Sequence, residues 1–221
     1  MPAHSLQELL VEELRDIYDG EKRLTKALPQ MARAARSQEL RTAFMNHLRD
    51  TERHVTRLEQ VFRTLGETAR GKKCDGIIGL VEEGKKAMKE LDGAVLDAAL
   101  IAGGQKVEHY EIATYGTLGS FAELLGNERA KELLGETLDE EKAADEKLTM
   151  IAKSDVNRQA LTGDGEEEAD GRSAFGRRQR TMDSPTSAND EAAQRRSSGT
   201  RRRRSRSRKS TGTSRARRSR R

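Results

Sequence analysis

Apolar side chains recur every three or four residues along four segments of this 221-residue chain, the spacing of one buried face on an α-helix. Ser5 and Ser37 stand where helix N-caps are expected, and Gly66 and Gly126 stand where helices end. Pro29 predicts an interruption and a bend in the first helix. A weaker, glycine-punctuated stretch predicts a short helical piece, and strand-like alternation is missing. The predicted helices cover about residues 5–35, 37–65, 77–91, 94–125 and 128–152.

The connections between these segments predict the topology. The first and last connections are short and the middle one is long, which fits a four-helix bundle whose single crossover joins parallel neighbouring helices. That arrangement is ferritin-like. The predicted fold is therefore all-α, with a ferritin-like bundle over residues 1–160 and a short extra helix in the crossover. Residues 161–221 lose the apolar periodicity and are predicted to form a disordered tail.

Each apolar stripe contains polar side chains near its middle. A lone carboxylate that stays ionised inside a bundle costs several kcal/mol. Such a residue is therefore normally protonated, paired or bound to a cation. The middles of antiparallel helices share one level, so side chains from all four helices can converge there. A cluster of Glu and His from four helices is how a ferritin-like bundle binds two iron or manganese ions. The predicted ligands are Glu21, His54, Glu108, Glu111 and Glu141.

These ligands predict one or two bound ions per bundle, with iron favoured over manganese because hard oxygen donors tolerate both oxidation states of iron. Asp50, Glu140 and Asp145 are weaker candidates. The alternative is a structural polar core, in which the carboxylates are protonated or paired with Lys and Arg. His47 and His109 are expected at the surface or at an interface. Tyr115 is expected in the core, with its hydroxyl bonded to a carboxylate.

Five stretches resemble the YciE/YciF family, a ferritin-like family of bacterial stress-associated proteins. Together they cover about residues 5–160, and the run EHYEIATYGTL is highly specific. The resemblance implies a ferroxidase-like or oxidative-stress function that uses iron. The stretches are LRDIYDGEKRLTKALPQMARAA from Leu14, HLRDTERHVTRLEQVF from His47, KKCDGIIGLVEE from Lys72, DAALIAGGQKVEHYEIATYGTLG from Asp97 and LLGETLDEEKAADEKLTMIA from Leu133.

The wider ferritin-like pattern places one Glu on helix one, Glu-x-x-His on helices two and four, and one or two Glu on helix three. The resemblance therefore implies ligand roles for the five predicted residues. Two positions depart from the pattern: Thr51 replaces the Glu before His54, and Ala144 replaces the His after Glu141. The alternative register of Glu140 with Ala143 also lacks the His. A fully occupied two-metal centre is thus in doubt, and either a mononuclear site or a weakly bound second site is expected.

Charge divides the chain into two parts. Residues 195–221 hold fourteen of the 42 Lys and Arg and no acid, which leaves 28 basic against 37 acidic residues before them. Such a tail predicts sequence-independent, salt-sensitive contact with DNA or RNA phosphates, or with an acidic protein surface. The alternative function is then a non-enzymatic stress-response bundle protein that associates with nucleic acid. The residues expected to make this contact are Arg201, Arg202, Arg203, Arg204, Arg206, Arg208 and Lys209.

The remaining features concern the location of the protein in the cell, its cysteine chemistry and a partner surface. No apolar run is long enough to span a bilayer, and the N-terminus lacks the features of a secretory signal, so a cytoplasmic protein without membrane contact is expected. The single cysteine, Cys74, excludes an internal disulfide and a Cys-based metal centre. Leu9 and Val11 lie outside the main stripe of the first helix and predict a partner surface, most simply that of a homodimer.

Overall fold

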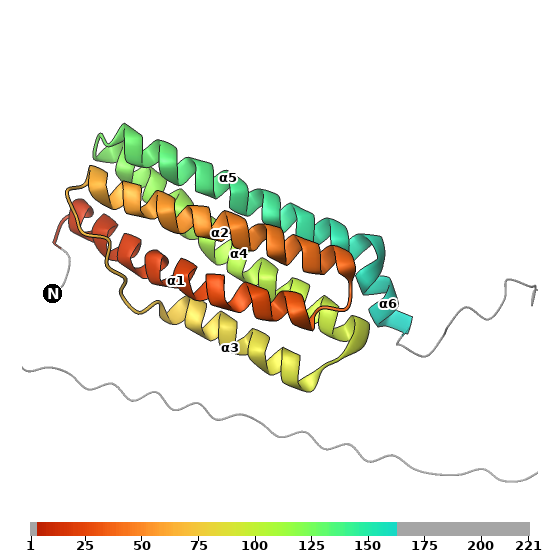
Figure 1. The fold of residues 1–221 in the computed structure, drawn as a ribbon. Helices are drawn as coiled ribbons and strands as arrows, with labels where there is room; N and C mark the ends of the chain where they lie inside the picture. The colour runs from red at the N-terminus through yellow and green to blue at the C-terminus, as the bar shows by residue number, and fades with distance from the viewer. Residues whose placement is uncertain (1–3, 163–221) are drawn as a thin grey trace, which may run out of the picture. The chain divides into compact units, whose positions relative to one another are not determined.

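The computed structural model describes residues 4–162, which form helices joined by short connections and contain no strand. The all-α class and the bundle predicted from the apolar pattern are confirmed. The Arg-rich segment and the predicted disordered tail beyond residue 162 lie outside the described residues. The elements in chain order are α1 (Leu6–Ala34), α2 (Gln38–Thr64), α3 (Asp75–Glu90), α4 (Gly93–Leu124), α5 (Glu128–Ile151), the π-helical turn η1 (Ala152–Val156) and α6 (Asn157–Thr162) (Figure 1).

The helix ends form at the residues that the sequence indicated. The Ser5 side chain accepts a hydrogen bond from the backbone N–H of Glu8 at 3.2 Å, and Ser37 caps α2 in the same way. Gly66 and Gly126 follow α2 and α4 with φ angles of 69° and 70°, a left-handed conformation that glycine adopts without strain. Local sequence thus fixes where the long helices begin and end.

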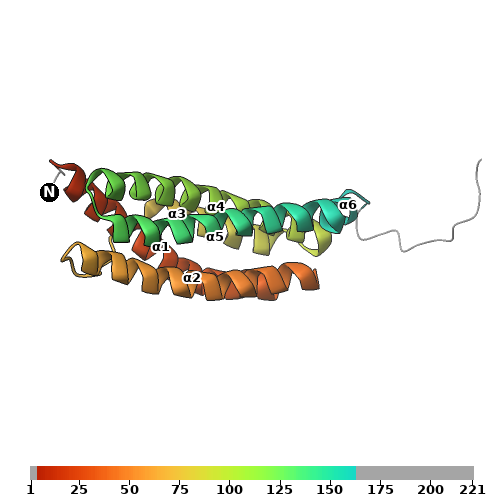
Figure 2. The same cartoon turned by 90° about the horizontal axis from the view of Figure 1, so that it is seen from above.

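The four long helices pack as two antiparallel pairs, α1 with α2 and α4 with α5 (Figures 1 and 2). The long connection carries α3, which packs against α1 and α4. It joins α2 to α4, and these two helices run in the same direction, as predicted (Figure 1). They are not neighbours, however, because α2 packs against α1 and α5 and lies diagonally across the bundle from α4. The prediction of adjacent parallel helices is therefore wrong, since every adjacent pair of long helices is antiparallel.

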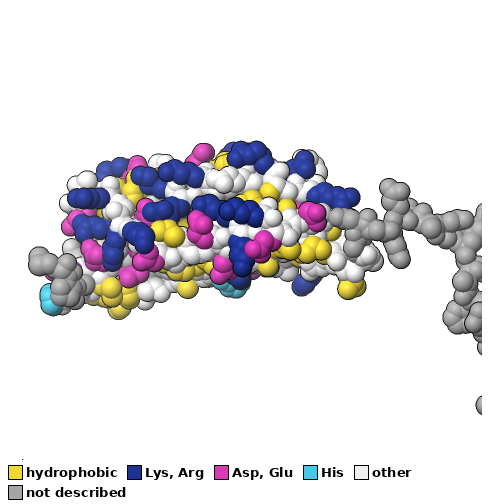
Figure 3. Space-filling view, turned by 90° about the horizontal axis from the view of Figure 1, so that it is seen from below, with side chains coloured by type: hydrophobic (Ala, Val, Ile, Leu, Met, Phe, Trp, Pro, Cys, Tyr) yellow, Lys and Arg dark blue, Asp and Glu magenta, His cyan; other side chains and the backbone are white. Residues whose placement is uncertain are grey.

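The hydrophobic core has two halves. One half surrounds Leu24, Phe44 and Leu148, and the other surrounds Ile17 and Leu58. Along every long helix the polar mid-helix residues lie between these halves, so the bundle carries a polar layer at one level. The outer surface carries interspersed Lys, Arg, Asp and Glu side chains, as expected for a chain with 36% charged residues (Figure 3). Within residues 4–162, no helix is both long and apolar enough to cross a membrane.

Three local expectations fail. α1 continues without a break through Pro29, because one missing N–H removes only one of the hydrogen bonds of a 29-residue helix. The helical structure also extends past the expected end near residue 152 to Thr162, since Val156 returns to the core with 4% exposure. Finally, Val11 is buried and Leu9 is exposed, so only one of the two residues assigned to a partner surface is available on the surface.

Candidate metal centre

The polar layer consists of side chains that are almost completely removed from solvent. Glu21, Glu111 and Glu141 are 0% exposed and Glu108 is 2% exposed. Two histidines of α2 complete the layer: His54 is 0% exposed and His47 is 7% exposed. All four long helices therefore contribute to one cluster. The five predicted ligands come together in it, and His47 joins them.

The cluster contains two overlapping groups of potential ligand atoms. The first is formed by His47, Glu108, Glu111 and Glu141, which each place one nitrogen or oxygen within 4.8 Å of the others. His47 Nε2 lies 3.4 Å from Glu108 Oε1 and 3.7 Å from Glu141 Oε2. The second is formed by Glu21, His54 and Glu141 under the same distance limit. Glu141 belongs to both groups, so its two oxygens connect them.

His54 faces the second group with its Nδ1 atom. This nitrogen is 2.9 Å from Glu141 Oε1 and 3.4 Å from Glu21 Oε1. Both distances are those of an ion pair, yet Nδ1 has no hydrogen bond of acceptable geometry. The nitrogen therefore lies among carboxylate oxygens without being aimed at one of them. That position suits a ligand to an ion held between them.

The carboxylates have few protein partners. Both oxygens of Glu111 and of Glu141, and one oxygen each of Glu21 and Glu108, are buried without a hydrogen bond. Among the described residues, no Lys or Arg forms an ion pair with any of these four glutamates. Buried polar groups are normally paired, because an unsatisfied one costs about 1–3 kcal/mol. Pairing with Lys or Arg therefore does not account for this cluster, whereas a divalent cation would satisfy the free oxygens together.

Burial controls the protonation of the cluster. It raises the pKa of Glu111 and of Glu108 well above the usual carboxyl value, and the neighbouring carboxylates add to the effect. Burial alone would lower the pKa of His54, but Glu141 and Glu21 outweigh it and raise that pKa to about 10. The metal-free cluster thus holds protons at neutral pH. A cation must displace them, so metal affinity is expected to rise with pH.

The second nitrogen of His54 has a separate anchor. His54 Nε2 donates to Glu140 Oε2 at 2.7 Å, and Arg57 donates to both oxygens of the same carboxylate at 2.9 and 3.2 Å. Burial alone would raise the pKa of Glu140, but Arg57 and His54 lower it to about 2, so this carboxylate is ionised. A carboxylate that accepts from the far nitrogen of a metal-binding histidine fixes the ring and its tautomer. Glu140 is thus a positioning residue, and Nδ1 is the nitrogen left for an ion.

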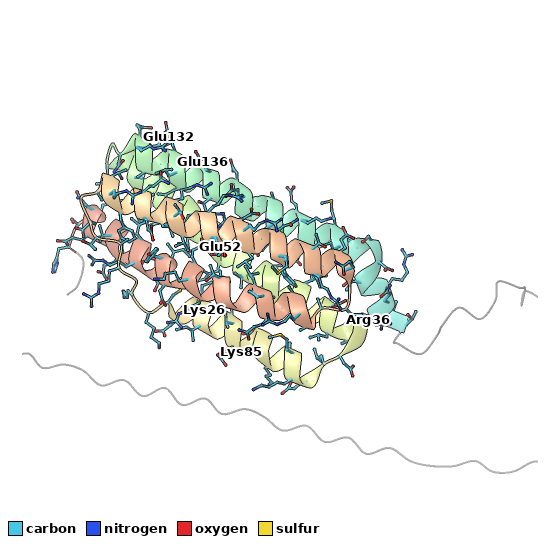
Figure 4. All side chains as sticks on the ribbon, in the orientation of Figure 1. Lys26, Arg36, Glu52, Lys85, Glu132 and Glu136 are labelled. Carbon is cyan, nitrogen blue, oxygen red and sulfur yellow. The ribbon has the colours of Figure 1, made fainter. Side chains whose placement is uncertain are left out.

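This arrangement predicts an effect of Glu140 on metal affinity. Replacing Glu140 with alanine should weaken Co²⁺ binding about 10–100-fold, the usual cost of losing the partner of a metal-bound histidine. Glu136→Ala is the matched control, because Glu136, labelled on α5 in Figure 4, also pairs with Arg57, at 3.2 Å, but its side chain is 56% exposed and belongs to neither ligand group. Isothermal titration with Co²⁺ measures both variants. An equal loss of Co²⁺ affinity in both variants would show that the ion pairs of Arg57, and not the hydrogen bond between Glu140 and His54, support metal binding.

The other sequence candidates lie around the cluster. Asp50 pairs with Arg53 at 2.6 Å, and Asp145 accepts from Gln105 at 2.9 Å, so neither is part of the two groups. Thr51 is buried and donates to the backbone carbonyl of His47 at 2.9 Å. Tyr115 is in the core and donates to Glu21, as expected. His109 is exposed, also as expected.

His47 is the residue that the sequence reasoning placed wrongly. It was expected at the surface or at an interface, but it is buried against Glu108 and Glu141. The apolar stripe of α2 could be continued through either His47 or Leu48, and the structure selects His47. One signal could have identified it: His47 and His54 are seven residues apart, which places them two turns apart on one helix face. His47 supplies the first group with the imidazole that Ala144 cannot provide.

Comparisons with known proteins agree with the fold and the predicted family. A family model described as a domain of unknown function, DUF892, matches residues 5–161. Protein YciF of Escherichia coli strain K12 is 43% identical over 162 residues, which cover 72% of this chain and 98% of the relative. The crystal structure of the E. coli stress protein YciF matches with 42% identity and a TM-score of 0.68, over 71% of this chain and 99% of that one. YcfI from Rhodopseudomonas palustris matches with 44% identity and a TM-score of 0.64, over 66% and 94% of the two chains.

Proposed function

The chain belongs to the YciE/YciF family, whose domain is the one described as DUF892, and we propose that it binds ferrous iron in its buried cluster and oxidises it during stress. The family supports the setting, since the E. coli relative is described as a stress protein. The cluster supports the chemistry. The observation that carries the proposal is a pair of ligand groups that share Glu141, both buried and both rich in oxygens without protein partners.

The donor set suits iron. Four carboxylates and two imidazoles are hard or intermediate ligands, which hold ferrous iron and favour the ferric ion more strongly because of its higher charge. The cluster contains no thiolate, because Cys74, the only cysteine, is separately buried beside Tyr110. Manganese has similar ligand preferences and is the second candidate. The first group offers four residues and the second three, so the first is the stronger position in this proposal.

Ferrous iron is a substrate in this reaction. Each ferrous ion gives up one electron, so two ions and two protons convert one hydrogen peroxide to two waters. Glu108 and Glu111, whose pKa values are raised in the metal-free protein, release their protons when the ion binds. Tyr115 holds one oxygen of Glu21 in place.

A double variant tests the proposal. Glu21→Ala/Glu111→Ala removes one carboxylate from each group, and we expect it to lose most of the iron that the wild-type protein retains after iron loading. Its rate of ferrous oxidation by peroxide should fall to the rate without protein. Glu82→Ala/Glu132→Ala is the control, because both of its side chains are 62% exposed. Equal iron content and equal oxidation rates in all three proteins would reject iron oxidation as the function.

A further inference from the structure

A groove of about 430 Å³ between α2 and α5 reaches the cluster. Two buried residues of the first group, His47 and Glu108, line it together with exposed residues of both helices. The groove therefore connects solvent with the ligand atoms of the first group. Within the described part of the chain, none of Glu21, His54 and Glu141 contributes to its lining.

Two alanines keep this side of the bundle open. Ala143 and Ala144 line the groove from α5, and His47 of α2 and Glu108 of α4 line it from the other helices. Ala144 is also the position at which the ferritin-like pattern has a histidine. A larger side chain at either residue would occupy the groove, because only a methyl group extends into it from each. The absence of a ligand at position 144 therefore coincides with an opening to solvent.

The second group is more enclosed among the described residues. Its members Glu21 and His54 are 0% exposed. Tyr115 bonds to Glu21 on one side, and Glu140 with Arg57 covers Nε2 of His54 on the other. An ion could reach this group only after the bundle loosened, or by way of Glu141 from the first group. The two positions differ in access as well as in their number of ligands.

The charged side chains that line the groove form ion pairs. Glu39, Asp50 and Glu140 lie along it, and Lys147 is the single lysine among the lining residues. Each of these acids has a basic partner: Glu39 pairs with Lys147, Asp50 with Arg53 at 2.6 Å, and Glu140 with Arg57 at 2.9 Å. A divalent cation fits the destination of the groove, because His47 and Glu108 offer potential ligand atoms there.

We propose that the α2–α5 groove is the route by which a divalent cation enters and leaves the centre, and that the small side chains of Ala143 and Ala144 keep this route open. The inference rests on the proposed function, since it requires the cluster to bind a metal. It adds that the position beside His47 and Glu108 is the one in exchange with solvent. The route predicts a change in the rate of binding without a change in the amount bound.

Stopped-flow mixing of the metal-free full-length protein with Co²⁺ tests the route. Ala144→Leu should slow Co²⁺ binding about tenfold or more, because entry would then require the helices to move apart. The number of ions bound at equilibrium should remain that of the wild-type protein. Ala143→Leu, at a more exposed position, is a second blocking variant that does not require internal space. Ala113→Leu is the control, since Ala113 is exposed on α4 away from the groove.

The outcomes separate the route from the function. Wild-type binding rates in both blocking variants, with normal equilibrium binding, would reject the route and leave the metal centre intact. Loss of equilibrium binding in both would make the groove residues part of the centre itself and would also reject the route. If the wild-type protein bound no Co²⁺, the proposed function would fail first.

Discussion

Replacing Glu141 with alanine is expected to abolish metal binding at both positions of the cluster. Glu141 is the one residue that belongs to both ligand groups, and its two oxygens face His54 and His47 at 2.9 and 3.7 Å. Removing a direct ligand should cost more than the roughly 10–100-fold that the loss of an outer partner costs. We therefore expect the affinity for Co²⁺ to fall by more than about 100-fold. Equilibrium dialysis with Co²⁺ measures both affinity and stoichiometry.

Two further variants make this result specific. Glu21→Ala removes a ligand of the second group alone, so it should lower the number of ions bound while the first group keeps its affinity. Glu132→Ala should bind as the wild-type protein does, because Glu132 lies on the same helix with its side chain exposed (Figure 4). Glu141→Gln keeps the volume of the side chain, so a loss of Co²⁺ binding in this variant cannot be caused by an internal cavity. Normal binding by both Glu141 variants would contradict a shared ligand.

The level of the cluster was predictable because helical periodicity is a strong constraint. Glu21 follows Ile17 and precedes Leu24 on one face, so its burial follows from theirs. Glu111 and Glu141 occupy equivalent positions on their own helices. Each of these side chains is completely buried, as the apolar stripes require. The convergence then follows from packing four helices of similar length in antiparallel pairs.

The contacts within the layer were less predictable, because a helix turns by about 100° per residue and adjacent residues flank the same stripe. His47 and Leu48 could not be separated on this basis. The anchor of His54 depends on Arg57 and Glu140. Glu140 was expected only as a weak candidate ligand, not as the partner of His54. Their pairing depends on the distance between α2 and α5. Periodicity within one helix contains no information about that distance.

The diagonal placement of α2 and α4 shows a similar limit. Loop lengths indicate which helices run in the same direction, and that prediction is correct. They do not determine which helices touch. Here α3 packs against α1 and α4, so the crossover covers that pair and leaves the α2–α5 side uncovered. The groove that reaches His47 and Glu108 lies on this uncovered side. The access route thus depends on a feature of topology that the sequence did not specify.

Replacing Glu111 with leucine is expected to stabilise the metal-free protein while removing metal binding from the first group. Both oxygens of Glu111 are buried without partners, so the folded metal-free state bears the cost of an unsatisfied carboxyl group. Exchanging buried ionic groups for apolar ones of similar volume is often neutral or stabilising, by about 1–4 kcal/mol. We expect a gain of about 1–3 kcal/mol in the free energy of unfolding in the presence of EDTA. Urea denaturation followed by circular dichroism measures it.

The pH dependence of this gain gives a second readout. The folded-state pKa of Glu111 is raised above the usual value of 4.5, so the folded wild-type protein holds a proton that the unfolded chain releases above that value. Its stability must therefore fall as the pH rises from 4.5 through the raised pKa. His54 adds to the fall, because its contribution is present below pH 6.5 and is lost as the pH rises through about 10. Glu111→Leu removes the contribution of this carboxyl group, so its free energy of unfolding should fall less steeply with rising pH than that of the wild-type protein.

Added Co²⁺ should reverse the order of stability. The ion binds only the folded state and stabilises the wild-type protein in proportion to the logarithm of its concentration, whereas Glu111→Leu should respond weakly. Glu123→Leu on the same helix is the control, because an exposed carboxylate carries no burial cost and its loss should change stability by less than about 0.5 kcal/mol. A destabilised Glu111→Leu protein with EDTA present would show that Glu111 is a satisfied member of a structural core. A stabilised one would show that the bundle gives up folding free energy to keep an unpaired carboxylate, which is the thermodynamic signature of a binding site.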